Sequence, residues 1–254
     1  MSPLQVAARG QTVGLVVSFP VAAATGADHL TRKDVAWALA SGLAVGIGLA
    51  LFYSAMVLGQ ISVVATTAAL VGAVLPVAVG LVRDERPGAP ALVGIGAALV
   101  AVAIVSVAPS GADVSREDAR RTLAFAAVAG VCFGFFLICL AQLGKGAGLW
   151  AAPLSRCASA GLLLLVVGVA RRERAPLRQL GRLILSIGAL EISAVICLVI
   201  AFRHGTLAIA SVLASLYPVT TVLLAAYVLR ERLTRLQLTA VVLALGAVVL
   251  ISTG

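Results

Sequence analysis

Residues 63–106 read VVATTAALVGAVLPVAVGLVRDERPGAPALVGIGAALVAVAIVS, and residues 209–252 read IASVLASLYPVTTVLLAAYVLRERLTRLQLTAVVLALGAVVLIS. The two stretches align without a gap, and each consists of an apolar span, a short turn with Glu-Arg and a second apolar span. A duplicated pair of apolar spans indicates a membrane protein built from two related halves, which commonly enclose a solute path near the bilayer midplane. The identical pairs include Leu70/Leu216, Glu85/Glu231, Arg86/Arg232, Ala98/Ala244, Leu99/Leu245 and Ser106/Ser252.

The composition excludes an ordinary soluble domain. Hydrophobic residues make up 61% of the 254-residue chain and charged residues only 11%, whereas charged residues are about 25% of a soluble domain. Apolar runs of roughly 20 residues recur, and runs of this length are typical of transmembrane helices. The sequence predicts an all-α integral membrane protein, a helical bundle of about nine transmembrane helices at residues 11–26, 35–58, 62–82, 90–109, 122–143, 150–170, 183–202, 207–229 and 236–253.

The charges and cysteines exclude several classes of function. The net charge of +9 would suggest a nucleic-acid partner in a soluble protein. Here the basic residues lie between apolar spans, where they set orientation in the membrane, so we expect no nucleic-acid partner. The four cysteines fall inside predicted spans without a C-x-x-C pair, so we expect no metal site. No motif for ATP or another cofactor is present in the sequence.

The polar connection at residues 110–121 divides the chain into two proposed repeats. Residues 1–109 form a first repeat with four spans, and residues 122–254 form a second repeat with five. The first repeat therefore lacks one helix at its start, and we interpret residues 11–26 as a short span rather than a signal peptide. A complete repeat has five spans. Because five is an odd number, equivalent loops of the two repeats lie on opposite membrane faces, and the repeats are predicted to be inverted.

Small residues one helical turn apart predict close helix contacts. They occur at Gly42/Gly46, Gly130/Gly134 and Ser211/Ser215. Such pairs let helix backbones approach closely in lipid.

The second copy carries the residues of a family resemblance. Leu216-Tyr217-Pro218-Val219 lies within a span, and Leu229-Arg230-Glu231-Arg232-Leu233 forms the following turn. The first copy has the related turn Arg83-Asp84-Glu85-Arg86-Pro87. Over essentially its whole length the chain resembles the EamA family of the drug/metabolite transporter superfamily. The resemblance implies ten helices in two inverted five-helix repeats, a central solute cavity and export of metabolites or drugs.

Three features depart from that family pattern. The first of the ten helices is missing. A count of basic residues places the C-terminus outside the cell, whereas the family topology places it in the cytoplasm. Pro218 corresponds in the first copy to Gly72 and not to Pro76, so the two halves are not expected to bend at the same level.

Glu191 and Arg156 are the charged residues expected within spans. A carboxylate inside a membrane is costly unless it is paired, hydrated or protonated. Glu191 therefore either binds a cationic group or exchanges protons during transport, or it packs against a neighbouring hydroxyl or arginine. Arg156 either extends to the interface or serves as a substrate ligand or as the ion-pair partner of Glu191. If the two residues pair, an anionic or zwitterionic substrate could compete for Arg156.

Aromatic residues and one proline complete the candidate site. Tyr53 and Tyr217 lie deep enough in their spans to line a cavity, whereas Trp150 begins a span and is expected at the interface. Pro218 removes a backbone hydrogen bond and is the candidate hinge. We predict Glu191, Arg156, Tyr53 and Tyr217 as substrate-binding residues, and no catalytic residue.

These expectations favour a secondary transporter that exports small metabolites, amino acids or drugs by alternating access between the two repeats. The proton is the candidate coupling ion, and the partners are a small-molecule substrate and membrane lipid. A flippase for lipid-linked substrates and a non-transporting membrane subunit are the alternatives. An embedded enzyme is disfavoured, because no acid–base pair or nucleophile constellation falls within a span. We expect a multi-pass protein of the cell membrane, specifically of the bacterial inner membrane. The sequence does not predict its oligomeric state.

Overall fold

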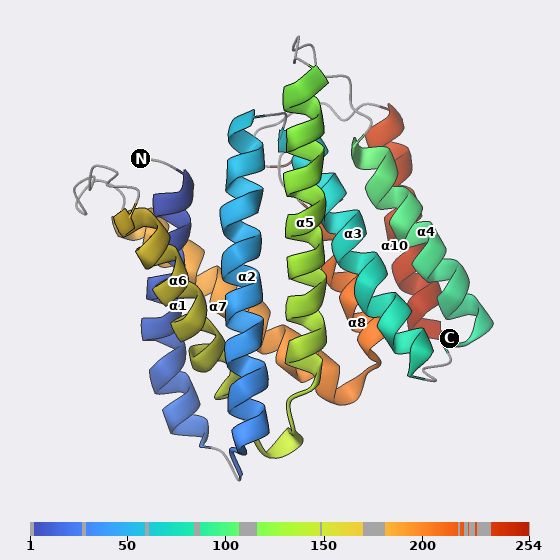
Figure 1. Ribbon diagram of the computed structural model, residues 1–254. Helices are drawn as coiled ribbons and strands as arrows, with labels where there is room; N and C mark the ends of the chain where they lie inside the picture. Colours follow the sequence, from blue (N-terminus) through green and yellow to red (C-terminus); the bar gives the residue numbers. More distant parts are fainter. Residues whose placement is uncertain are drawn as a thin grey trace. The chain divides into compact units, whose positions relative to one another are not determined.

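The computed structural model describes residues 3–26, 29–58, 61–83, 87–106, 116–147, 149–169, 181–217, 219–220, 223, 227 and 235–253. Within these ranges every regular element is a helix, and there is no strand. Figure 1 labels the α-helices, which are α1 (Pro3–Thr25), α2 (Arg32–Leu58), α3 (Ile61–Val82), α4 (Ala89–Ser106), α5 (Arg116–Ala141), α6 (Ala151–Val169), α7 (Gly181–His204), α8 (Leu207–Ala214) and α10 (Arg235–Thr253). A short 3-10 helix spans Lys145–Ala147.

Most of these helices can cross a membrane. α1, α2, α5, α6, α7 and the larger part of α3 are long and apolar enough to do so, while α4 and α10 hold shorter apolar stretches. The predicted all-α membrane bundle is therefore confirmed. The start of the first span is corrected, since α1 begins at Pro3 and not at residue 11. Gln5 and Gln11 lower the hydropathy of its first turns, yet both side chains are buried.

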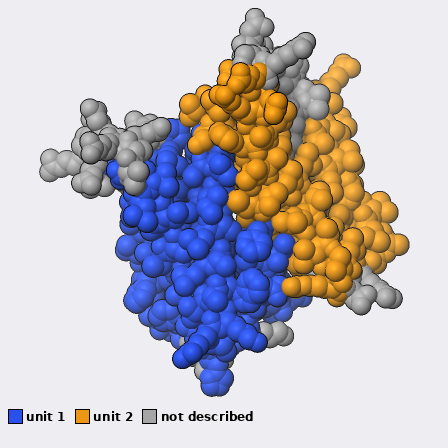
Figure 2. Space-filling model, viewed as in Figure 1, with its two compact units in different colours: residues 1–53, 135–204 blue, residues 54–134, 205–254 orange. Residues whose placement is uncertain are grey.

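The chain divides into two compact units, each made from two separate stretches of sequence (Figure 2). Unit 1 consists of residues 1–53 and 135–204, and unit 2 of residues 54–134 and 205–254. α2 and α5 contribute residues to both units. These units describe packing, whereas the proposed repeats 1–109 and 122–254 describe related sequence, so the division into repeats stays a prediction.

Glycines allow the helices of unit 1 to pack closely. α1 packs against α6 and α7 (Figure 1). A Cβ atom at Gly42 of α2 would lie 2.0 Å from the carbonyl oxygen of Ser155 on α6. One turn later, a Cβ atom at Gly46 would lie 3.3 Å from the Cα of Ser159. The predicted close contact at Gly42/Gly46 is confirmed.

Unit 2 contains a second contact of this kind, between α3 and α5. A Cβ atom at Gly130 would lie 2.7 Å from the carbonyl oxygen of Ala68, and one at Gly134 would lie 3.0 Å from that of Gly72. The backbones of the two helices touch here because glycine has no side chain. Larger residues at these positions would force the helices apart.

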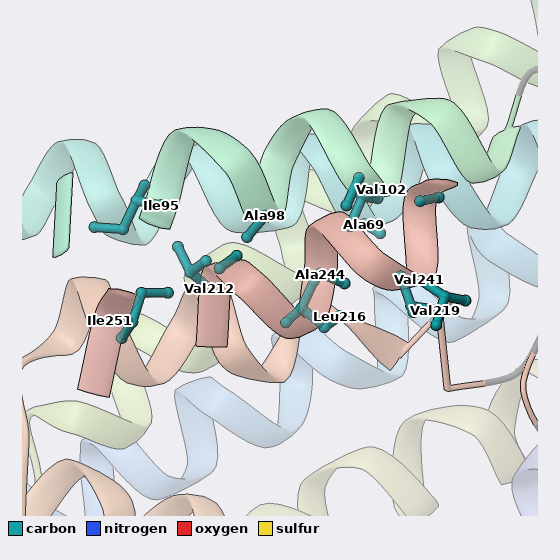
Figure 3. Packing of buried hydrophobic residues seen from close by; sticks show 13 residues of the cluster. Ala69, Ile95, Ala98, Val102, Val212, Leu216, Val219, Val241, Ala244 and Ile251 are labelled. Atoms are coloured by element: carbon teal, nitrogen blue, oxygen red, sulfur yellow. The ribbon is translucent and has the colours of Figure 1, made fainter. Parts of the chain in front are cut away.

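The duplicated segments of unit 2 pack against their own copies. α4 packs against its sequence equivalent α10, and α3 against its equivalent α8. The buried residues of this contact form one apolar cluster, which Figure 3 shows: Ala69, Ile95, Ala98, Ala101, Val102, Val212, Leu216, Val219, Ala240, Val241, Ala244, Ala247 and Ile251.

α4 and α10 run in opposite directions. A Cβ atom at Gly94, near the start of α4, would lie 2.8 Å from Ile251, near the end of α10. Figure 3 shows Val102 on the side of Val241, at the other end of the contact. An inverted repeat predicts this antiparallel pairing of equivalent helices.

Candidate functional site

Three helices of unit 1 each place one polar side chain at a common point. These side chains are Gln11 of α1, Arg156 of α6 and Glu191 of α7, and all three helices are candidate membrane spans. α1 and α7 approach each other closely, because a Cβ atom at Gly188 would lie 3.0 Å from the carbonyl oxygen of Gly10. Residues far apart in the sequence thus meet inside one unit.

Arg156 and Glu191 form an ion pair. Arg156 Nη1 donates to Glu191 Oε2 over 2.9 Å, and Arg156 Nη2 donates to the backbone carbonyl of Glu191 over 3.3 Å. The structure therefore brings together the two charged residues that were predicted to lie within spans. Their role in binding a substrate stays a prediction.

Gln11 connects the ion pair to a third helix. Its Nε2 donates to Glu191 Oε2 over 3.0 Å, and its Oε1 accepts a hydrogen bond from Arg156 Nη1. The same Oε1 accepts from the hydroxyl of Ser159 over 2.8 Å. We call Gln11, Arg156, Ser159 and Glu191 the polar network.

The two charges of the polar network differ in exposure. The side chain of Arg156 is 6% exposed and that of Glu191 is 35% exposed. The stem of Arg156 passes beside Gly14, where a Cβ atom would lie 3.5 Å from the Arg156 Cδ and Nε atoms. The guanidinium is therefore enclosed by α1 and α7 and does not extend to an interface. Glu191 is the member of the pair that keeps an accessible surface.

Tyr53 of α2 belongs to the same unit. Its ring is half-buried and packs against a cluster that includes Ala7, Ala8 and Leu163. Ala7 and Ala8 precede Gln11 on α1 by four and three residues, which is about one helical turn. The predicted site residue Tyr53 is thus near the polar network.

Tyr217 belongs to unit 2. Its hydroxyl donates to the carbonyl oxygen of Ala65 on α3 over 2.9 Å, and the residue is 41% exposed. This hydrogen bond joins the two copies of the duplicated segment. The predicted hinge, Pro218, lies outside the described residues.

Trp150 contributes to a separate apolar pocket in unit 1. Its ring contacts Phe19 edge to face, with ring centroids 5.6 Å apart. The pocket has a volume of about 520 Å³, which is within the range of small-molecule sites. Its lining comes from α1 and from the start of α6: Leu15, Val16, Phe19, Trp150, Pro153, Leu154 and Cys157.

Sequence reasoning missed Gln11 and Ser159. Gln11 stood at the expected edge of the first span, where an amide would face water, whereas α1 actually begins two turns earlier. Ser159 did carry a usable signal. Ser159 follows Arg156 by three residues and Ser155 by four, which places it beside both of them on the helix surface.

The helices and the polar network together define a multi-pass membrane protein with an ion pair inside its bundle. The sequence model of the EamA-like transporter family matches residues 120–253, which is more than half of the chain. The chain therefore belongs to the EamA-like transporter family, and the predicted resemblance is confirmed. Members of this family are membrane transporters of the drug/metabolite type.

Solved structures confirm the fold. Among 25 matching chains, one crystal structure superposes with a TM-score of 0.81 at 18% sequence identity, covering 99% of this chain and 89% of the other. At this identity the likeness extends to the fold alone. No curated protein matches the sequence.

Proposed function

We propose that this transporter exports a small metabolite, amino acid or drug by alternating access between its two repeats. The membrane that it crosses is the cell membrane, which in bacteria is the inner membrane. The observation that supports this proposal most strongly is the polar network. Charged side chains inside a membrane are costly, and they typically mark substrate or ion pathways. The three helices that hold Gln11, Arg156 and Glu191 are all candidate spans.

Export needs a source of free energy, and we propose that the proton supplies it through Glu191. Protonation of the carboxylate removes the charge that Arg156 Nη1 contacts, and so weakens the ion pair. Among the residues that the structure describes, Arg156 is the charged group in contact with the Glu191 carboxylate. A change in the ion pair would alter contacts of α1, α6 and α7 together, because Gln11 of α1 bonds to both Arg156 and Glu191.

The experiment is a comparison of metabolites in the medium of cells that express the unchanged chain, Glu191→Gln or Glu117→Gln. Glu117 is a matched control, because its carboxylate is 73% exposed and pairs with Arg121 at the surface. We expect at least one compound to accumulate outside cells with the unchanged chain and with Glu117→Gln, and to fall at least tenfold with Glu191→Gln. Equal media in all three cultures, with each protein shown to be in the membrane, would contradict export through Glu191.

A further inference from the structure

Glu191 is the more exposed member of the ion pair. The side chain of Glu191 is 35% exposed, whereas that of Arg156 is 6% exposed and is bonded to Gln11 and Glu191. A ligand that approaches this site from its accessible side therefore meets negative charge first. An anion would face the Glu191 carboxylate before it could reach the guanidinium behind it.

Among the described residues, hydrogen bonds reach one oxygen of this carboxylate. Arg156 Nη1 and Gln11 Nε2 both donate to Glu191 Oε2. Within the part of the chain that the structure describes, no donor reaches Oε1. An ionised carboxylate has about two acceptor positions on each oxygen, so Oε1 is open to a donor from outside the protein.

We infer that the ligand of this site carries a protonated amine whose N–H groups donate to Glu191 Oε1. This inference rests on the proposed transport function and specifies its substrate class. Charge-assisted hydrogen bonds between an ammonium and a carboxylate are about twice as strong as neutral ones.

Arg156 and Gln11 are positioning residues in this arrangement. Their donors bond to Oε2, which leaves Oε1 for the ligand. The sequence left two ligand hypotheses open: a cationic group at Glu191, and an anionic or zwitterionic substrate at Arg156. The exposure of the two side chains favours the first, a cationic group at Glu191.

The test is ligand binding by the purified full-length protein, which does not depend on transport. The probes are hexylamine, hexanol and hexanoate, which share a hydrocarbon chain and differ in charge. Thermal stabilisation of the detergent-solubilised protein is titrated with each probe at neutral pH. We expect saturable stabilisation by hexylamine, and at least tenfold weaker effects of hexanol and hexanoate.

Variants connect this binding to the carboxylate. Glu191→Gln is expected to weaken hexylamine binding at least tenfold, and Glu117→Gln to leave it unchanged. Because Glu191→Gln leaves a buried arginine without its partner, the double variant Arg156→Gln/Glu191→Gln is measured as well, and it should also fail to bind the amine. Arg156→Gln alone should retain binding, since the ammonium then serves as the counter-charge of Glu191.

Three outcomes would overturn the inference. They are stronger stabilisation by hexanoate than by hexylamine, equal effects of all three probes, and unchanged hexylamine binding in the double variant. A protein that binds the amine but exports nothing would contradict the proposed function and leave the inferred ligand class intact. The two proposals therefore fail separately.

Discussion

Gln11 uses both ends of its amide to connect two charged side chains. Its oxygen accepts from Arg156 and Ser159, and its nitrogen donates to Glu191. Among uncharged side chains, only those of glutamine and asparagine carry a planar amide, which can donate and accept at once. Gln11 therefore orders the ion pair without adding a charge to the membrane interior.

Replacing Gln11 by leucine should destabilise the protein by about 1–3 kcal/mol, because a buried arginine donor loses an acceptor. The Ser159 hydroxyl then keeps only its longer hydrogen bond, 3.2 Å, to the carbonyl of Arg156. The measurement is the unfolding transition in detergent. Gln142→Leu is the matched control, since Gln142 makes a single 3.3 Å hydrogen bond to the carbonyl of Ile138 at the end of α5. Equal losses in the two variants would contradict a special role for Gln11.

The charged residues of the site could be predicted from sequence, and their neutral partners could not. Arg156 and Glu191 each interrupt an apolar run, which makes them conspicuous. Gln11 is 145 positions from Arg156 and 180 from Glu191 in the chain. Only the packing of α1 against α6 and α7 reveals that contact.

At the scale of helices, glycine positions decide which elements touch. The α2–α6 contact depends on Gly42, whose missing side chain leaves room for the carbonyl of Ser155. The hydroxyls of Ser41 and Ser155 are 2.9 Å apart beside this contact and are hydrogen-bonded. A short backbone separation and a buried hydrogen bond thus support the same pair of helices.

Gly42→Ala should destabilise the protein by about 1–3 kcal/mol, the usual cost of overfilling a packed site. Gly161→Ala is the control on α6, where a Cβ atom would meet nothing within 4 Å. Thermal unfolding of both variants measures the difference. A loss in Gly161→Ala as large as in Gly42→Ala would show that the α2–α6 contact is not the cause.

Several helix positions followed from the sequence. The α5 and α7 helices contain the predicted spans 122–143 and 183–202 almost entirely. α1 was predicted too short, because Gln5 and Gln11 resemble residues of a polar flank. Their burial against neighbouring helices depends on tertiary packing, which local hydropathy does not contain.

For the whole molecule, the antiparallel contact of α4 with α10 has a consequence for topology. Ala89 and Arg235 are equivalent in the two copies, and each is the first residue of its helix. Because the helices run in opposite directions, their first residues must face opposite sides of the membrane. Family resemblance and charge counting disagree on absolute orientation, but neither affects this relation.

Single cysteines introduced as Ala89→Cys and Arg235→Cys test that relation. Both positions are exposed, and the background replaces the four native cysteines by serine. We expect a membrane-impermeant maleimide to label one position on intact cells and the other only after permeabilisation. Labelling of both positions from the same side would contradict the inverted arrangement of the two copies.

Ala98 and Ala244 are equivalent residues, and Figure 3 shows both near the middle of the α4–α10 contact. In a protein that carried the duplicated segment only once, the helix equivalent to α4 and α10 would meet the same helix of a second molecule across a two-fold axis. One mutation at the central position would then change both sides of that homodimer at once. Gene fusion removes the constraint, because each copy can mutate alone. Ala69 and Ser215, which are equivalent and buried, have already diverged in this way.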